Sequence, residues 1–254
     1  MFILKKVYCR IFQKVFRIAL PLLPYREPEI LESIELIPET VVKNGCKKPI
    51  IVTDKGIVNL GLIDSLVEAL KKSEIPFAIY DQTVPNPTTD NVNACVNVIR
   101  ENNADFAVAL GGGSPMGCCK AACAIAKGDD IIESYHTGGK PINKDEVIPM
   151  IAVATTSGTG SEITNISVLT DLSKNVKSTM NDPLMYPKAA IVDPRLTLSV
   201  PPKVTASTGL DVLSHALESV WSVLHQPICE SCSVHATKLV FEWLYKAYSE
   251  PDNL

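Results

Sequence analysis

Apolar runs of strand length alternate with patterns of helical spacing along the first two thirds of the chain. The β-branched run at 49–54 predicts a strand, and residues 58–71 then repeat apolar side chains at the spacing of a helix face. The same pair of patterns recurs at 75–80 and 88–100. Strands separated by helices in this way imply βαβ crossovers and a parallel sheet.

Three further apolar runs extend the predicted sheet, at 106–110, 148–154 and 189–193. The first of them shows no alternation of polar and apolar residues, which is typical of a strand buried on both faces. We therefore predict an α/β domain over residues 1–199.

Strand patterns end near residue 200, where Pro201 and Pro202 interrupt the chain. Residues 205–221 and 228–248 have helical spacing, so residues 200–254 are predicted to be helical. No internal repeat relates this region to the one before it.

The first 25 residues mix apolar and basic side chains. The basic residues are Lys5, Lys6, Arg10, Lys14 and Arg17. They leave no uncharged stretch of about 18 residues to span a bilayer, and their interleaving is unlike a secretory signal. Two interpretations stay open: a basic amphipathic helix on a membrane surface, or a segment that packs on its own domain or on a partner subunit.

Composition narrows the class of function. The chain has 24 Lys and Arg against 28 Asp and Glu, a net charge of −4 without a basic block, which argues against nucleic acid as a partner. Its 8 cysteines are scattered and do not form a disulfide framework, which favours a cytoplasmic location.

A glycine-rich turn, residues 111–115, follows the strand predicted at 106–110 and reads Gly-Gly-Gly-Ser-Pro. Glycines let backbone N–H groups approach a ligand, Ser114 is expected to cap the following helix, and Pro115 suits its first turn. A helix N-terminus attracts negative charge, so we predict a pyrophosphate site, with tight packing as the alternative.

A second polar turn, residues 155–162, follows the strand predicted at 148–154 and offers five hydroxyl groups and two glycines. The carboxyl ends of parallel strands share one edge of a sheet, so both turns are expected to face one crevice and one ligand. A solvated loop is the alternative. Asp54, which ends the first strand, is placed to bind ribose hydroxyls and to repel a 2′-phosphate, which favours NAD over NADP.

Asp211 and His215 lie four residues apart in a predicted helix, so both side chains emerge on one face. A carboxylate and an imidazole suit a divalent metal, but catalytic metals generally need three or more protein ligands. An ordinary helix-surface pair is the alternative.

Together these motifs resemble the iron-containing (group III) alcohol dehydrogenases. The family's motifs occur in order at 52–55, 84–87, 111–115, 155–162, 193–194 and 206–218. The resemblance implies a Rossmann-like dinucleotide domain followed by the first helices of an incomplete, helical metal-binding domain. The implied coenzyme contacts are Asp54, Gly112, Gly113, Ser114, Thr155, Thr156, Thr159 and Lys177, and the implied metal ligands are Asp211 and His215.

The resemblance implies NAD(P)-dependent hydride transfer between a small primary alcohol and its aldehyde, with Fe²⁺ or Zn²⁺ as Lewis acid, in a homodimer. Gly117 stands where the family usually has Asp, which removes one expected coenzyme contact. Family members continue well beyond residue 254 and carry two histidine ligands there. We therefore expect a truncated chain that is inactive alone; the alternative is a non-catalytic nucleotide-binding module that pairs with a separate helical half.

Such a chain is expected to leave apolar helix surface uncovered. The residues concerned are Leu210, Leu213, Leu217, Val220, Trp221, Val240, Phe241, Trp243 and Leu244.

Overall fold

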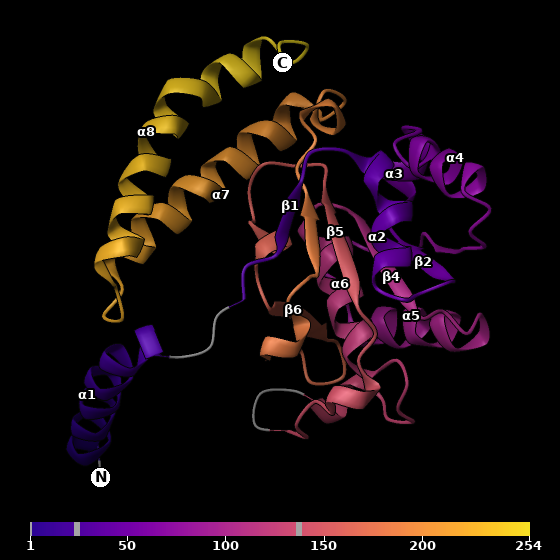
Figure 1. Ribbon diagram of the computed structural model, residues 1–254. Coiled ribbons are helices and arrows are strands. Elements are labelled where there is room, and N and C mark those ends of the chain that lie inside the picture. The colour runs from indigo at the N-terminus through magenta and orange to yellow at the C-terminus, as the bar shows by residue number, and fades with distance from the viewer. Residues whose placement is uncertain (1, 23–25, 136–138) are drawn as a thin grey trace. The chain divides into compact units, whose positions relative to one another are not determined.

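The computed structural model contains two compact units (Figure 1). It describes residues 2–22, 26–135 and 139–254. The α/β unit comprises Arg26–Thr156 and Gly160–Ser199, and the helical unit comprises the N-terminal helix, Ser157–Thr159 and Val200–Asn253. The threonine-rich turn is therefore divided between the two units.

The elements have the following bounds. The strands are β1 (Glu29–Leu31), β2 (Pro49–Val52), β3 (Ala78–Tyr80), β4 (Phe106–Gly111), β5 (Met150–Ala154), β6 (Ile166–Asp171), β7 (Val176–Asn181) and β8 (Ala189–Ile191). The helices are α1 (Phe2–Ala19), α2 (Ile37–Lys43), α3 (Lys55–Asn59), α4 (Asp64–Lys72), α5 (Thr89–Glu101), α6 (Gly113–Ile125), α7 (Pro202–Trp221) and α8 (Pro227–Ser249). Short 3₁₀ turns are η1 (Leu20–Leu22), η2 (Ile34–Leu36), η3 (Ile132–Tyr135), η4 (Lys144–Glu146), η5 (Ser161–Ile163), η6 (Pro183–Met185) and η7 (Pro194–Thr197).

Six parallel strands form one sheet in the order β1-β8-β5-β4-β2-β3, which confirms the predicted parallel α/β fold. Counted from β2, five of them follow the doubly wound order 2-1-3-4-5, and β1 is added beside β8. The winding direction reverses between β2 and β4. Open parallel sheets bind ligands at the carboxyl ends of their strands, at such a reversal.

Alternate residues of the buried strands pack against opposite layers of helices. In β4, Ala107 and Ala109 pack with α5 and α6, whereas Phe106 and Val108 pack with α2 and α4. Successive side chains of a strand point to opposite faces, so an uninterrupted apolar run fits a strand covered on both sides.

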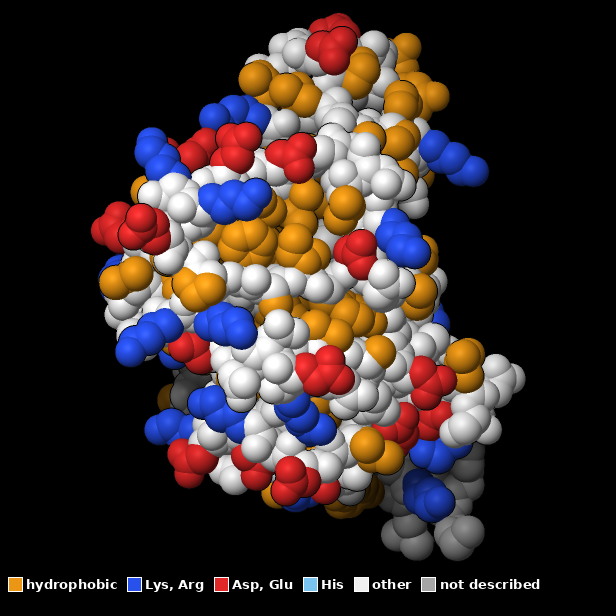
Figure 2. All heavy atoms as spheres, turned by 90° about the vertical axis from the view of Figure 1, so that its right-hand side faces the viewer, with side chains coloured by type: hydrophobic (Ala, Val, Ile, Leu, Met, Phe, Trp, Pro, Cys, Tyr) orange, Lys and Arg blue, Asp and Glu red, His pale blue; other side chains and the backbone are white. Residues whose placement is uncertain are grey.

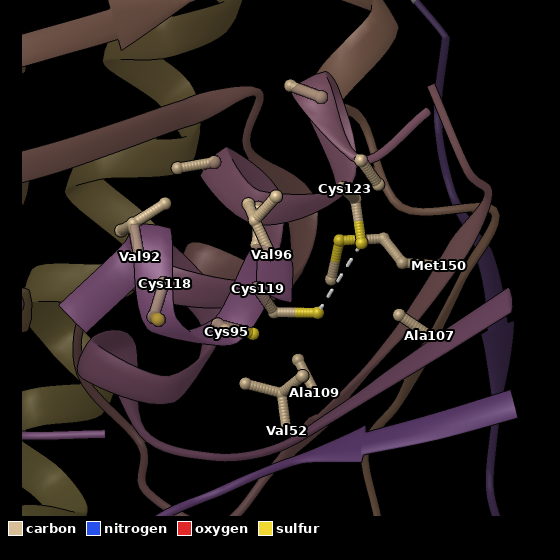
Figure 3. Close-up of a cluster of buried hydrophobic side chains, with 14 of the residues drawn as sticks. Val52, Val92, Cys95, Val96, Ala107, Ala109, Cys118, Cys119, Cys123 and Met150 are labelled. Carbon is tan, nitrogen blue, oxygen red and sulfur yellow. Dashed lines mark hydrogen bonds between the residues drawn. The ribbon is translucent and has the colours of Figure 1, made fainter. Parts of the chain in front are cut away.

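Cysteines fill much of the layer between α5, α6 and the sheet (Figure 3). Cys118, Cys119 and Cys123 are buried, and Cys119 and Cys123 bring their Sγ atoms to 3.8 Å. Burial raises the pKa of the Cys95 and Cys119 thiols, because it disfavours the thiolate. These thiols act as small packing residues.

Some elements differ from the prediction. The helix predicted over 58–71 is wrong as a single element: α3 ends at Asn59 and α4 begins at Asp64. Gly61 lies between them at a φ of 70°, a conformation that breaks a helix and that glycine adopts without strain. The antiparallel hairpin of β6 and β7 was not predicted either.

Basic and acidic side chains are interspersed on the face of the molecule in Figure 2, with apolar side chains exposed among them. Mixed signs give little net potential over such a face. This view thus agrees with the near balance of charge along the chain.

In the helical unit, α7 and α8 pack closely, and Gly209 lies against the side chain of Leu244. Few of their residues are buried: Gly209 and Ala216 in α7, and Ser233 in α8. Trp221 is 74% exposed and Phe241 is 76% exposed, which confirms uncovered apolar surface at these positions. Among the described helices, none has both the length and the apolar character needed to cross a bilayer.

Candidate dinucleotide site

The glycine turn places the start of α6 at the carboxyl end of β4. Gly111 has a φ of 147°, and a Cβ atom there would lie 2.7 Å from Cγ of Pro115. Gly112 is the N-cap residue of α6 and has extended backbone. The first N–H groups of a helix lack intrahelical acceptors, so this turn presents backbone donors at the edge of the sheet.

Ser114 does not cap α6, and that prediction is wrong. Gly112 takes the N-cap position and makes no side-chain cap, which puts Ser114 inside the first turn. The Ser114 Oγ instead accepts a hydrogen bond from the Asn86 N–H at 3.3 Å. Glycine fits the cap because a Cβ at Gly112 would lie only 3.1 Å from Oγ1 of Thr156.

The first two residues of the threonine-rich turn meet the glycine turn, whereas a crevice and a ligand shared by the two whole turns stay a prediction. Gly111 and Ala154 pair at the ends of β4 and β5, and the Thr155 N–H donates to the Gly111 carbonyl at 3.2 Å. Thr155 is buried, whereas Thr156 is half-buried and lies against Gly112. Backbone donors and threonine hydroxyls therefore share one edge of the sheet.

Asp54 lies at the point where the winding reverses. Its Oδ1 accepts the Ile57 N–H at 3.0 Å, so the carboxylate caps α3 with one of its two oxygens. The preceding residue, Thr53, donates its hydroxyl to the Leu110 carbonyl at 2.8 Å. This bond ties the end of β2 to the strand that enters the glycine turn.

Lys177 joins the same edge through a residue that the sequence analysis did not assign to the site. The Lys177 Nζ donates to Oδ1 of Asn86 at 3.3 Å, and the Asn86 N–H reaches Ser114. Asn86 has a φ of 55°, a conformation that asparagine tolerates well. Its place between Pro85 and Pro87 was the available sign of a fixed turn.

Lys120 is a second residue that the sequence analysis missed. It is 1% exposed, and its Nζ donates to the Ser161 carbonyl at 2.5 Å and to Oγ1 of Thr164 at 2.9 Å. Burial lowers the pKa of Lys120 to about 8, although Glu162 acts in the opposite direction. The buried ammonium fastens α6 to the end of the threonine-rich turn, at Ser161, and to Thr164 just after it. The sign in the sequence that could have revealed Lys120 was a single lysine among the small residues of a predicted helix.

Thr159 belongs to the segment that groups with the helical unit. In that unit, Gly158 lies against α7, where a Cβ would come within 2.6 Å of Cβ of Thr208. A coenzyme contact by Thr159 therefore stays a prediction.

Asp211 and His215 form an exposed pair on α7, with 3.7 Å between Oδ1 and Nε2. Asp211 lines a shallow depression together with Ser207, Thr208, Leu210 and Ser214. Within the described residues, no group of three or more His, Cys, Asp or Glu side chains is arranged to hold a metal ion. The pair has suitable donor chemistry but too few donors for a metal site.

An open parallel sheet with a glycine turn, a helix N-terminus and threonine hydroxyls at its switch point defines the dinucleotide-binding α/β class. Residues 31–194 match the family "Iron-containing alcohol dehydrogenase", and residues 205–254 match the "Fe-containing alcohol dehydrogenase family, C-terminal". The chain belongs to the iron-containing alcohol dehydrogenase family.

Named relatives agree with this membership. The chain is 37% identical to long-chain-alcohol dehydrogenase 1 of Geobacillus thermodenitrificans, over 84% of this chain and 53% of that protein. It is 34% identical to sulfoacetaldehyde reductase of Bilophila wadsworthia, over 90% of this chain and 59% of that protein. The chain thus spans about half the length of the curated relatives it matches.

The fold also matches the crystal structure of sulfoacetaldehyde reductase from Bifidobacterium kashiwanohense in complex with NAD⁺. The TM-score is 0.84 and the identity 43%, over 91% of this chain and 61% of that one. The coverage includes most of both units.

Proposed function

We propose that this chain binds the coenzyme of a NAD-dependent alcohol dehydrogenase that interconverts a small primary alcohol and its aldehyde. The observation that carries the proposal is the meeting of the two turns, by the Thr155 N–H bond to Gly111 and the contact of Thr156 with Gly112. The glycine cradle has room for a ligand backbone where side chains would obstruct it, so the residues fit a pyrophosphate.

Each predicted residue has a part in this proposal. The N–H groups of Gly112, Gly113 and Ser114 bind the pyrophosphate at the start of α6. Asp54 caps α3 with Oδ1 and binds the adenosine ribose with its other carboxylate oxygen, Oδ2. Four further residues orient the rest of the coenzyme. These are Thr155, Thr156, Thr159 and Lys177. When bound, the coenzyme supplies the hydride-accepting nicotinamide.

Asp211 and His215 are proposed as two ligands of the metal that gives the family its name. Fe²⁺ is the expected ion, and Zn²⁺ is the alternative. Two donors are too few for a metal site, so we propose that this chain does not turn over substrate by itself.

A short aldehyde with an anionic sulfonate is the more specific substrate that we propose. The supporting observation is that two sulfoacetaldehyde reductases occur among the similar proteins, the structure bound to NAD⁺ at 43% identity and the protein of Bilophila wadsworthia at 34%. The test measures NADH oxidation by a metal-loaded dehydrogenase that contains this chain as its coenzyme-binding part, with sulfoacetaldehyde or with acetaldehyde as the substrate. Faster NADH oxidation with acetaldehyde would exclude the sulfonate preference.

Coenzyme binding is tested by fluorescence titration of the chain with NADH and NADPH. We expect NADH to bind at least about 10-fold more tightly, because the Asp54 carboxylate repels a 2′-phosphate. Asp54→Asn keeps a capping oxygen and removes the charge, so this preference should shrink while the fold is retained. Asp64→Asn, in the first turn of α4, is the matched control. No response of the folded chain to NADH contradicts the proposal.

A further inference from the structure

Helix α1 exposes an apolar face that the coenzyme site does not use. The apolar side chains exposed along it are Val7, Tyr8, Ile11, Phe12, Val15 and Ile18. At about 100° per residue they cover an arc of roughly 140° on one side of the helix. Tyr8, Phe12 and Phe16 stack along this side, with ring centroids 6.5 and 5.7 Å apart.

The charges of α1 have a single sign. Residues 1–25 contain five basic residues and no Asp or Glu, although the whole chain has a net charge of −4. Lys6, Arg10 and Arg17 lie on the side of the helix away from the apolar arc, whereas Lys5 and Lys14 lie at its two edges. A helix with a basic face and an apolar, aromatic-rich face is the pattern of segments that lie in a membrane interface.

The end of α1 is attached to the rest of the helical unit through polar contacts. The Arg17 guanidinium lies 3.0 Å from Nε2 of His225, and Gln226 donates to the Arg17 carbonyl at 2.7 Å. The exposed apolar side chains between Val7 and Val15 take no part in these bonds. The structure therefore leaves this face exposed within its own unit. Packing on a partner subunit, the other part of that interpretation of the sequence, is an outcome that the test below separates.

We propose that α1 docks in the plane of an anionic lipid surface. The apolar arc enters the boundary between headgroups and acyl chains, and the basic residues contact anionic headgroups. Charge complementarity favours lipid over a second copy of this chain, because two such helices would bring ten like charges together. The basic residues that interrupt the apolar runs keep the helix in the interface rather than across the bilayer.

Sedimentation of the full chain with lipid vesicles tests this proposal. We expect binding to phosphatidylcholine vesicles that contain about a third phosphatidylserine, weak binding to pure phosphatidylcholine, and release at about 1 M salt. The variant Lys5→Gln/Arg10→Gln/Lys14→Gln should bind about 100-fold more weakly, since each basic residue near such a surface contributes about fivefold. Lys71→Gln/Lys72→Gln, on exposed positions of α4, is the matched control and should bind as the unaltered chain does.

A second variant, Ile11→Ser/Phe12→Ser/Val15→Ser, tests the apolar arc and should also lose binding, with an unchanged thermal transition of the α/β unit. Equal binding to neutral and anionic vesicles, or binding that survives the loss of three charges, would overturn the proposal. So would self-association without lipid that Phe12→Ser abolishes, because the face would then belong to a second copy. The measurement requires no coenzyme, so it is independent of the proposed dehydrogenase activity.

Discussion

Helices α6 and α7 differ sharply in how much of their surface the protein covers. In α6, every residue from Pro115 to Ile125 is buried, including a lysine and three cysteines. In α7, which is longer, only Gly209 and Ala216 are buried, although the helix carries several leucines and a tryptophan. Similar apolar content therefore has different consequences, because only α6 has a strand layer, a neighbouring helix and a hairpin around it.

The difference extends to the two candidate sites. Around α6, the glycine turn and the threonine-rich turn are fixed by hydrogen bonds that join β2, β4 and β5 at their carboxyl ends. On α7, Asp211 and His215 form a pair held by one helix face alone. A site built from several strands gains its geometry from the core, whereas a site on one exposed helix needs further elements to complete it.

Truncation of one phenylalanine in each region gives the largest expected contrast. Phe106→Ala, at a fully buried position of β4, should lower the free energy of unfolding by about 3–5 kcal/mol. Phe241→Ala, at a position of α8 that is 76% exposed, should change it by less than about 0.5 kcal/mol. Urea denaturation followed by circular dichroism measures both values. Equal losses would show that α8 is covered in solution.

Two glycines near the start of α6 sharpen the comparison within one region. Gly111→Ala should cost about 3 kcal/mol, because φ is 147° and the new Cβ would meet Pro115. Gly117→Ala is the control: its Cβ would lie 3.6 Å from Oγ of Ser167, an ordinary contact. In a helix interior, this change should leave stability within about 1 kcal/mol of the original, on the stabilising side. Comparable losses at both positions would exclude strain as the reason for Gly111.

The buried Lys120 predicts a pH dependence of stability. Its pKa is lowered to about 8 from 10.5, so below pH 8 the ammonium is charged in both states and the burial cost is fully present. Between pH 8 and 10.5 the folded chain loses this proton first and the unfolded chain binds more protons, so stability rises with pH. The rise should reach roughly 2–3 kcal/mol.

The difference in the free energy of unfolding between the unaltered chain and the Lys120→Met variant, measured at each pH, separates the effect of Lys120 from that of other groups that titrate at high pH. The Met variant should lack the rise, whereas Lys71→Met, at an exposed position, should keep it. Parallel stability curves for the chain and the Lys120→Met variant between pH 8 and 10.5 would contradict a lowered pKa for Lys120.

Several features of the fold could be predicted from local sequence. The apolar run 106–110 and the glycine turn after it predicted both β4 and the start of α6, because burial on two faces and the absence of Cβ atoms leave direct marks on residue type. The threonine-rich turn, Asp54 and the Asp211–His215 spacing were also visible in the sequence, because each depends only on residue type and on positions a few residues apart. By contrast, β1 has only three residues, and nothing in them shows that they pair with β8.

Contacts between distant residues decided the rest. Asn86 contacts both Ser114 and Lys177, which lie 28 and 91 positions further along the chain. Gly112 rather than Ser114 caps α6, and a side chain at Gly112 would meet Thr156. Residue type and periodicity determined which segments form strands, helices and polar turns, since those depend on neighbours a few positions away. The tertiary structure alone decided which polar groups meet and which apolar faces are covered, because these depend on how the strands are ordered in the sheet.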